Sequence, residues 1–211
     1  MTIPPDRPLR GDAERNRRLI LDTADRMLAQ RGSTVTLNEI AREAGLGVGT
    51  VYRRFADLES IIDVLFGERF AHFVDIAENA QQEADPGHAL TGYILTAAAW
   101  RAGDPGLETI LGNARLERPE VAEFRNALGS RIDRLVASAL EAEAVHADFA
   151  SADVYNMLFM LGAVADRTEA TSPGAWRRYA VVLLAGFGLE TADGPGAMTD
   201  DELLRAWPQR R

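Results

Sequence analysis

Apolar side chains recur at every third or fourth position through most of this 211-residue chain, which is the spacing of a buried helix face. A first helix is expected to run to about Arg31, with Ile20, Ala24 and Leu28 facing inward and Gly32 ending it. Further helices are expected at about 58–85, 88–102, 106–116, 120–145, 152–170 and 174–190. No alternating pattern typical of strands appears, so we predict an all-α protein.

The stretch from Thr36 to Phe55 (TLNEIAREAGLGVGTVYRRF) predicts two short helices joined by a glycine turn. Thr36 and Glu39 have the T-x-x-E spacing of a capping box, in which the hydroxyl accepts from a free backbone amide and the carboxylate accepts from the cap. Gly45 can take the left-handed conformation that ends a helix. A second helix is then expected from Val48 to Phe55.

This second helix carries a threonine and two arginines opposite its apolar side. The apolar side holds Val48, Val51, Tyr52 and Phe55. Thr50, Arg53 and Arg54 share the other side, at i, i+3 and i+4. The alternative is a surface hairpin whose arginines only meet water, since short motifs often match by chance. The order of elements favours a helix-turn-helix unit, because a supporting helix precedes the pair and a long helix capped by Asp57 follows it.

Residues from about Arg15 to Val74 resemble the N-terminal domain of the TetR (tetracycline-repressor) family of transcriptional regulators. The resemblance rests on ILDTADRMLAQRG, the T-x-x-E-I-A-x-x-A-G run and GVGTVYRRF followed by a capped helix. It implies an N-terminal three-helix helix-turn-helix DNA-binding domain, followed by a C-terminal helical domain for ligand binding and dimerisation. We expect a flexible arm at 1–12, the DNA-binding domain at 13–57, the helical body at 58–190 and a tail at 191–211.

Two positions depart from the family pattern. The family often has serine where Gly47 stands, although glycine is an acceptable N-cap. It commonly has a phosphate-binding lysine where Leu58 stands, so that contact is expected to be absent or supplied elsewhere.

The resemblance implies a set of residues that contact DNA. Arg53, and secondarily Arg54, are expected to reach base edges or phosphates, because arginine reads guanine bidentately. The hydroxyls of Thr50, Tyr52 and Thr36 are expected to bind phosphates, and Gly49 to let the backbone approach DNA. The full expected set is Thr36, Gly47, Val48, Gly49, Thr50, Tyr52, Arg53 and Arg54.

The net charge of −9 is unevenly distributed along the chain. Residues 1–56 contain ten arginines and seven acidic residues, a balance of +3, whereas the rest carries 13 arginines and 25 acidic residues, a balance of −12. Binding to the DNA backbone needs local positive charge rather than a basic whole protein. The acidic body is therefore expected to direct nucleic acid toward the N-terminal part.

Two late segments, Val154 to Ala165 and Ala180 to Leu189, are apolar almost all round. A helix that is apolar on every side must be buried on every side, so a second subunit is the expected cover, as in the TetR family; burial within one subunit is the alternative. The expected homodimer interface comprises Val154, Leu158, Leu161, Gly162, Ala165, Val182, Gly186 and Leu189.

By the same resemblance, the body is expected to bind a small, mainly apolar effector. The expected pocket residues are Phe66, Phe70, Tyr93, Trp100, Asn113, Arg115, Met157 and Met160. For each aromatic residue the alternative is ordinary core packing. A bound effector would tilt the fourth helix and change the separation of the two recognition helices.

Other chemistry is not indicated. Cysteine is absent, the three histidines are scattered, and we find no catalytic or nucleotide-binding motif, so we expect neither an enzyme nor a metal or cofactor site. The polar N-terminus and short apolar runs indicate a cytoplasmic protein without a membrane span.

We therefore predict a homodimeric, ligand-responsive repressor that binds an inverted-repeat operator in double-stranded DNA. A helical ligand-binding module, or an architectural DNA-binding protein without an effector, is the alternative.

Overall fold

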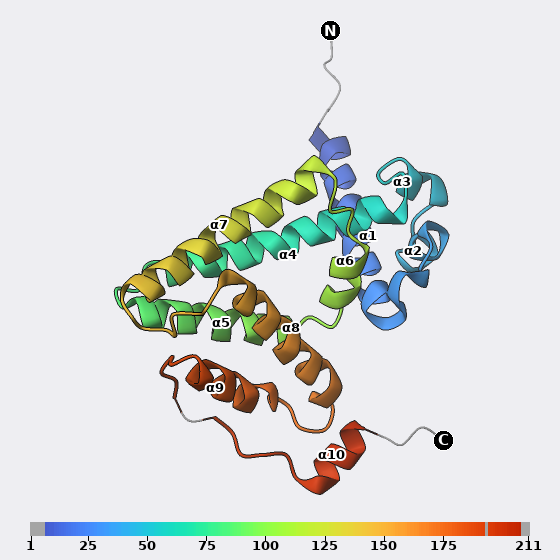
Figure 1. Cartoon of the computed structure of the whole chain (residues 1–211). Helices are drawn as coiled ribbons and strands as arrows, with labels where there is room; N and C mark the ends of the chain where they lie inside the picture. The colour runs from blue at the N-terminus through green and yellow to red at the C-terminus, as the bar shows by residue number, and fades with distance from the viewer. Residues whose placement is uncertain (1–6, 193, 208–211) are drawn as a thin grey trace. The chain divides into compact units, whose positions relative to one another are not determined.

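A computed structural model describes residues 7–192 and 194–207 of the chain, with side chains from Gly11 onward (Figure 1). These residues contain helices and no strand, which confirms the all-α prediction. The helices are α1 (Arg7–Arg31), a 3-10 turn (Gly32–Thr34), α2 (Leu37–Glu43), α3 (Val48–Tyr52), α4 (Leu58–Ala80), α5 (Pro86–Ala102), α6 (Leu107–Asn113), α7 (Pro119–Glu141), α8 (Ser151–Thr168), α9 (Trp176–Gly186) and α10 (Asp200–Ala206).

The chain forms two compact units, and each unit is built from two separate stretches of sequence. The first contains the residues up to Arg69 together with Gly106–Ala122. The second contains Phe70–Pro105 together with the residues from Glu123 onward. Both α4 and α7 therefore begin in the first unit and end in the second.

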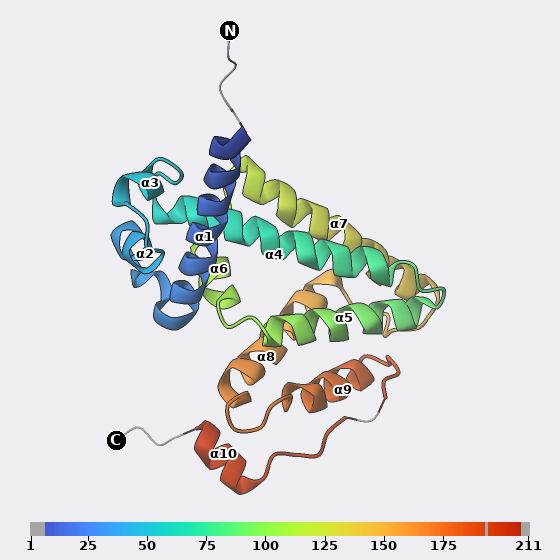
Figure 2. The same cartoon turned by 180° about the vertical axis from the view of Figure 1, so that it is seen from behind.

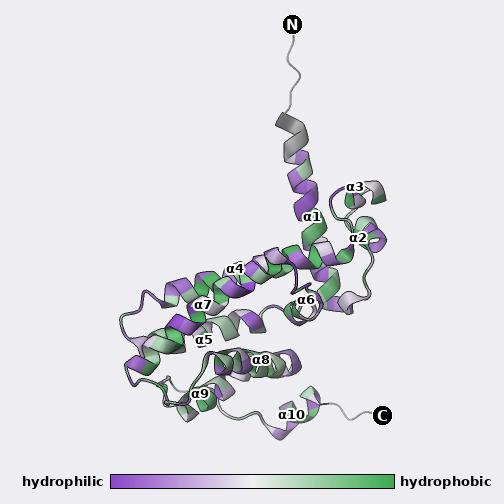
Figure 3. Ribbon diagram, turned by 45° about the horizontal axis from the view of Figure 1, so that its top comes forward, coloured by the Kyte–Doolittle hydropathy of each residue, from purple (hydrophilic) through white to green (hydrophobic). Residues whose placement is uncertain are grey.

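In the first unit α1 packs against α2 and α6, and α2 packs against α3, as both Figure 1 and Figure 2 show for α1, α2 and α3. Figure 3 shows mainly hydrophilic residues where the coloured part of α1 begins and a hydrophobic stretch beyond them. The core of this unit includes the residues of the first helix that were expected to face inward, Ile20, Ala24 and Leu28. Its fully buried members include Ile20, Ala24, Leu28, Ile40, Ala41, Val51, Ile61 and Ile62.

In the second unit α8 packs against α5 and α9. One core cluster there consists of Ala98, Leu161, Ala165, Trp176 and Ala180. Beside this cluster, the buried Arg101 side chain pairs with Asp166 through two bonds of 3.1 and 2.7 Å. Gly162 makes room for this pair, because a Cβ atom there would lie 2.7 Å from Nε of Arg101.

Several helix ends differ from the prediction. Helices α6, α7 and α9 end at Asn113, Glu141 and Gly186 rather than near residues 116, 145 and 190. Helix α1 already includes residues 7–12 of the expected flexible arm, because Pro8 near its start tolerates a missing amide and Asp12 pairs with Arg15 one turn later; residues 1–6 lie outside the described residues. Helix α4 ends at Ala80 rather than near Asp85, because Asp85 instead caps α5 by accepting from the backbone N–H of His88 at 2.8 Å. The recognition helix α3 ends at Tyr52 rather than Phe55.

The tail forms a short helix, α10, capped by Thr199 and Glu202, which have the same T-x-x-E spacing as Thr36 and Glu39. The backbone N–H of Thr199 donates to Glu202 at 2.7 Å, and that of Glu202 donates to the Thr199 hydroxyl at 3.3 Å. The guanidinium of Arg167 lies 5.8 Å from the centre of the Trp207 ring. The capping box of Thr199 and Glu202 therefore stabilises the start of α10.

Candidate nucleic-acid interface

Helix α2 begins at the expected capping box, and a neighbouring arginine strengthens it. The backbone N–H of Thr36 donates to Glu39 at 2.9 Å, and that of Glu39 donates to the Thr36 hydroxyl at 3.3 Å. Arg31 adds a bond of 2.6 Å to the other oxygen of the same carboxylate. The bonds from Arg31 and Thr36 lower the pKa of Glu39 to about 2. Because the Thr36 hydroxyl also donates to Glu39 at 2.8 Å, its proton serves this cap.

The turn between α2 and α3 is a Schellman motif. Gly45 has φ of 66°, its N–H donates to the carbonyl of Arg42, and the N–H of Leu46 donates to the carbonyl of Ala41. A side chain at residue 45 would be strained in this backbone conformation. Gly45 therefore fixes the direction in which the chain enters α3.

Helix α3 buries one side and exposes the other. Val51 is fully buried and Phe55 is nearly so, which confirms their expected place in the core. Val48 and Tyr52, expected on the same apolar side, are instead 46% and 50% exposed. With only five residues, α3 is too short for four apolar side chains to reach one core. Val48 and Tyr52 therefore lie on its exposed surface with Gly49 and Arg53.

The polar side chains of α3 are connected to each other. The Nη2 of Arg53 donates to the hydroxyl oxygen of Thr50 at 3.2 Å, an interaction that the sequence pattern did not reveal. The Thr50 hydroxyl still holds a proton that it can donate to a phosphate. Arg53 and Arg54 are both exposed. The bond to Thr50 orients the Arg53 guanidinium.

The glycines of this region do not serve the packing of their own unit. A Cβ atom at Gly49 would meet nothing within 4 Å, and one at Gly47 would meet only the Thr50 hydroxyl at 3.8 Å. Gly47 has φ of −64°, which any residue can adopt. The exposed surface of α3 is therefore flatter than the fold itself requires.

An ionic cluster stabilises the start of α4, the helix that follows α3 in the sequence. Asp57 accepts from the backbone N–H of Ser60 at 2.7 Å, which confirms its expected capping role and lowers its pKa, with Ser60 as the main cause. Arg115 binds Asp63 at 2.6 Å and Asp57 at 3.5 Å, and Arg118 binds Asp63 at 3.1 Å. Hydrogen bonding to Asp63 raises the pKa of Arg115.

The residues expected to line an effector pocket have varied surroundings. Phe66, Asn113 and Arg115 belong to the first unit and the other five to the second. Arg115 is engaged with Asp63, and Asn113 is exposed and donates to the carbonyl of Thr109 at 2.7 Å.

Among the second-unit members, Phe70 and Trp100 both contact the ring of Phe73 edge to face, with ring centres 6.3 and 4.8 Å from its own. Met157 is buried and Met160 is exposed. Tyr93 is fully buried, and its hydroxyl finds no hydrogen-bond partner among the described residues. Burial raises the pKa of that hydroxyl.

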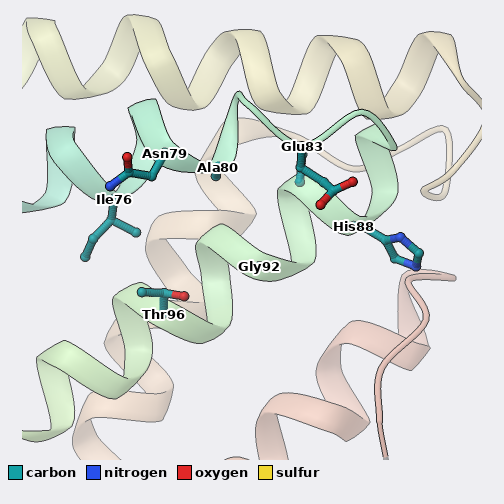
Figure 4. A pocket seen from close by; sticks show the side chains of 8 residues that line it. Ile76, Asn79, Ala80, Glu83, His88, Gly92 and Thr96 are labelled. Atoms are coloured by element: carbon teal, nitrogen blue, oxygen red, sulfur yellow. The ribbon is translucent and has the colours of Figure 1, made fainter.

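A pocket of about 280 Å³ opens in the second unit between the end of α4 and α5 (Figure 4). It is lined by Ile76, Asn79, Ala80, Glu83, His88, Ala89, Gly92 and Thr96. None of the expected effector residues lies there, and half of the lining is polar or charged. This pocket therefore does not match the apolar site that the sequence predicted.

The residues expected at a subunit interface are mostly internal. Five of them are buried within the chain: Val154, Leu161, Gly162, Ala165 and Leu189. Leu158 packs partly against the core cluster, and only Val182 and Gly186 are exposed. The exposed apolar residues of α8 and α9 are instead Tyr155, Phe159, Met160, Tyr179 and Val182, which we call the α8–α9 face.

Other kinds of site are not found in the described part of the chain. It holds no cluster of His, Asp and Glu side chains that would bind a metal ion. None of its helices combines the length and the apolar character that crossing a membrane requires.

Both units resemble known regulators in sequence. Residues 20–65 match the family model described as bacterial regulatory proteins of the tetR family, and residues 85–189 match that of the C-terminal domain of SbtR-like transcriptional regulators. An HTH-type transcriptional regulator of Staphylococcus aureus (strain MRSA252) is 39% identical over 82 residues, which make up 36% of this chain and 43% of that regulator. The match thus spans less than half of this relative's length.

Solved structures resemble the chain over most of its length. The crystal structure of a TetR transcription regulatory protein from Mycobacterium vanbaalenii is 30% identical, with a TM-score of 0.56, and the alignment covers 85% of this chain and 99% of that one. The fatty acid degradation regulator FadR from Bacillus halodurans shares the fold with a TM-score of 0.63 at 20% identity, over 81% of this chain and 95% of its own.

Proposed function

Because this chain belongs to the TetR family of DNA-binding transcriptional regulators, we propose that it is a homodimeric repressor that a small-molecule effector releases from its operator. The observation that carries the proposal is the exposed surface of α3. There the flat backbone at Gly49 lies beside Val48, Tyr52 and Arg53, while Val51 holds the helix to the core. A recognition helix in the major groove requires such a surface.

Within this surface the contacts divide by chemistry. Arg53 reads a base edge, because its guanidinium can bond two acceptors of guanine at once. Thr50 orients Arg53 through the 3.2 Å bond and donates its own proton to a phosphate. Arg54 and the Tyr52 hydroxyl bind phosphates. Thr36 supports them indirectly, as the cap of α2.

The dimer forms through the α8–α9 face. Its five exposed side chains include three aromatic rings, Tyr155, Phe159 and Tyr179, the residue type that dominates subunit interfaces. A two-fold dimer presents two α3 helices in opposite directions, so the operator is an inverted repeat. The proposed interface thus uses the same two helices that the sequence indicated, but of the expected side chains it keeps only Val182.

The effector binds in the second unit, and Tyr93 supplies its polar anchor. A buried hydroxyl without a partner costs roughly 1–3 kcal/mol, which a ligand offering a hydrogen-bonding atom recovers. The other residues we assign to this site are apolar: Phe70, Trp100 and Met157. Helix α4 passes from the second unit into the first, so it can carry a change at the effector site toward α3.

Selection from a pool of randomised duplex DNA tests the DNA-binding half of the proposal. We expect enrichment of inverted repeats, and affinity for them that falls steeply as salt is raised. Arg53→Ala should lose about 1–3 kcal/mol of binding and relax the preference at one base pair of each half-site. A strictly monomeric protein, or a pool with no enriched palindrome, would overturn this function.

Titrating candidate compounds into the preformed DNA complex tests the effector half. A compound that releases the wild-type protein should act much more weakly on Tyr93→Phe, which keeps the ring and removes the hydroxyl. Since the hydroxyl is buried and unpaired in the free protein, we expect Tyr93→Phe to be more stable than the wild type, by up to roughly 1–3 kcal/mol. A variant that responds fully to the compound would show that Tyr93 is not the anchor.

A further inference from the structure

Val48 is an apolar side chain that the fold leaves uncovered at the start of α3. It is 46% exposed, whereas Val51, one turn further along α3, is fully buried and supplies the contact with the core. A β-branched residue also gives α3 no gain in helix propensity. The packing and the helix preference of the first unit therefore give no reason for valine at this position.

The two neighbours of Val48 are glycines that the fold does not require. A Cβ atom at Gly49 would meet nothing within 4 Å, and the contact at Gly47 would be an ordinary one of 3.8 Å. The methyl groups of Val48 consequently stand between two stretches of bare backbone. A partner surface can approach these methyl groups closely, without obstruction from the adjacent residues.

In the major groove one base carries an apolar group that matches such a side chain. Thymine presents its C5-methyl group there, whereas the other base edges present hydrogen-bond donors and acceptors that a valine would leave unpaired. We propose that Val48 reads the C5-methyl group of a thymine in each operator half-site. This inference rests on the proposed function, in which α3 enters the major groove.

The position of Arg53 gives the inference a second constraint. Helical spacing places Tyr52 and Gly49 between Val48 and Arg53 on the exposed surface, so the apolar reader and the cationic reader lie on either side of these two residues. Arg53 is itself oriented by Thr50, on the side away from Val48. Each half-site should thus contain a thymine read by Val48 close to the base read by Arg53.

Uracil substitution tests this inference, because uracil pairs like thymine and lacks only the C5-methyl group. The operator selected by the wild-type protein is synthesised in several versions. In each version one thymine position carries uracil, and the same position is changed in both half-sites. The affinity for each version is measured at one salt concentration. At one position we expect binding to weaken roughly fourfold for each half-site, the size of one buried methyl-sized group.

The protein variants then assign that effect to a residue. Val48→Ala removes the two methyl groups that reach furthest from the helix, so its ratio of affinities for the thymine and uracil operators should fall toward one. Arg54→Ala is the matched control, since it should weaken both complexes alike and keep the wild-type ratio. Circular dichroism checks that both variants fold, as expected for exposed positions.

Two results would overturn the inference. The first is that uracil is tolerated at every position of an operator that the protein binds specifically, and the second is that Val48→Ala keeps the wild-type ratio. Either result leaves the proposed function standing. If the selection yields no operator at all, the proposed function fails and the role of Val48 fails with it.

Discussion

At the scale of single residues, three glycines serve three different physical ends. Gly45 has a positive φ that a side chain would strain, and Gly162 leaves room for the guanidinium of Arg101. Gly49 does neither, because its φ is not positive and no atom lies near the place of its missing Cβ. Because the fold does not require glycine at this position, we propose that Gly49 serves the contact of α3 with DNA.

Gly49→Ala should separate folding from DNA binding. Alanine lowers the cost of ordering a helix, so we expect the free energy of unfolding to rise by about 0.5–1 kcal/mol. The added methyl group would hold α3 away from DNA and weaken operator binding by about tenfold, or ~1.4 kcal/mol. Thermal unfolding and operator titration measure the two effects, and a variant that gains stability while binding normally would contradict the assignment.

Glu39 should make the stability of the first unit depend on pH in the acid range. Its pKa is about 2 instead of 4.5, because Arg31 and Thr36 bind the charged form. A lowered pKa in the folded state stabilises the protein above the unfolded value, and this contribution is lost as the pH falls from about 4.5 toward 2. Glu39→Gln lacks it at every pH.

Urea unfolding followed by circular dichroism checks this prediction. The wild type should be more stable than Glu39→Gln by a constant amount near neutral pH, and the difference should shrink below about pH 4.5. A difference that stays unchanged at about pH 2.5 would show that the carboxylate has no special partner in the folded protein.

The residue-level features that the sequence predicted are those that neighbours along the chain create. The capping box of Thr36 and Glu39 and the turn at Gly45 each depend on residues a few positions apart. The pair of Arg115 and Asp63 joins residues 52 positions apart, so no local pattern announces it and Arg115 was expected at the effector.

At the scale of helices, the ends depend on which residues cap the free backbone N–H groups of the next helix. Asp85 and Pro86 were expected to end one helix, but both residue types favour a helix start, and they begin α5. The pairing of α5 with α8 depends in turn on Arg101 and Asp166, which lie across that contact.

Gly162→Ala should loosen the contact between α5 and α8. The new methyl group would displace the guanidinium of Arg101 from Asp166, and such overpacking typically costs about 1–3 kcal/mol. Gly92→Ala on α5 is the matched control, because a Cβ atom there meets nothing within 4 Å and should stabilise the protein by about 0.5–1 kcal/mol. Equal unfolding temperatures for the two variants would contradict this account.

At the scale of the whole molecule, the sequence indicated which helices lack a partner but not which of their sides. Helix α8 is apolar nearly all round, so its composition cannot tell the stripe of Val154, Leu161 and Ala165 from that of Tyr155 and Phe159. The first stripe is buried against the rest of its own unit, which leaves the second for a partner. That choice depends on packing between helices far apart in the sequence.

Phe159→Glu should break the proposed dimer. The side chain is 62% exposed in the single chain, and a two-fold interface would bury a charge there twice. We expect the dissociation constant of the dimer to rise by about 30-fold or more, the scale of a central interface residue. Analytical ultracentrifugation measures this change. Phe124→Glu, an exposed aromatic of α7 outside the α8–α9 face, should leave the dimer intact, and equal behaviour of the two variants would exclude this face.

The ion pairs of Arg115 and Arg118 with Asp63 limit how this chain can be divided into fragments that fold. The first unit includes Gly106–Ala122, so a fragment cut after Arg69 would lack α6 and leave the carboxylate of Asp63 without its cations. Fusing the first unit to the ligand-binding domain of another regulator would therefore require transferring two separate stretches of sequence. Recombination at a single crossover point, in the laboratory or in evolution, would yield a first unit that is already incomplete.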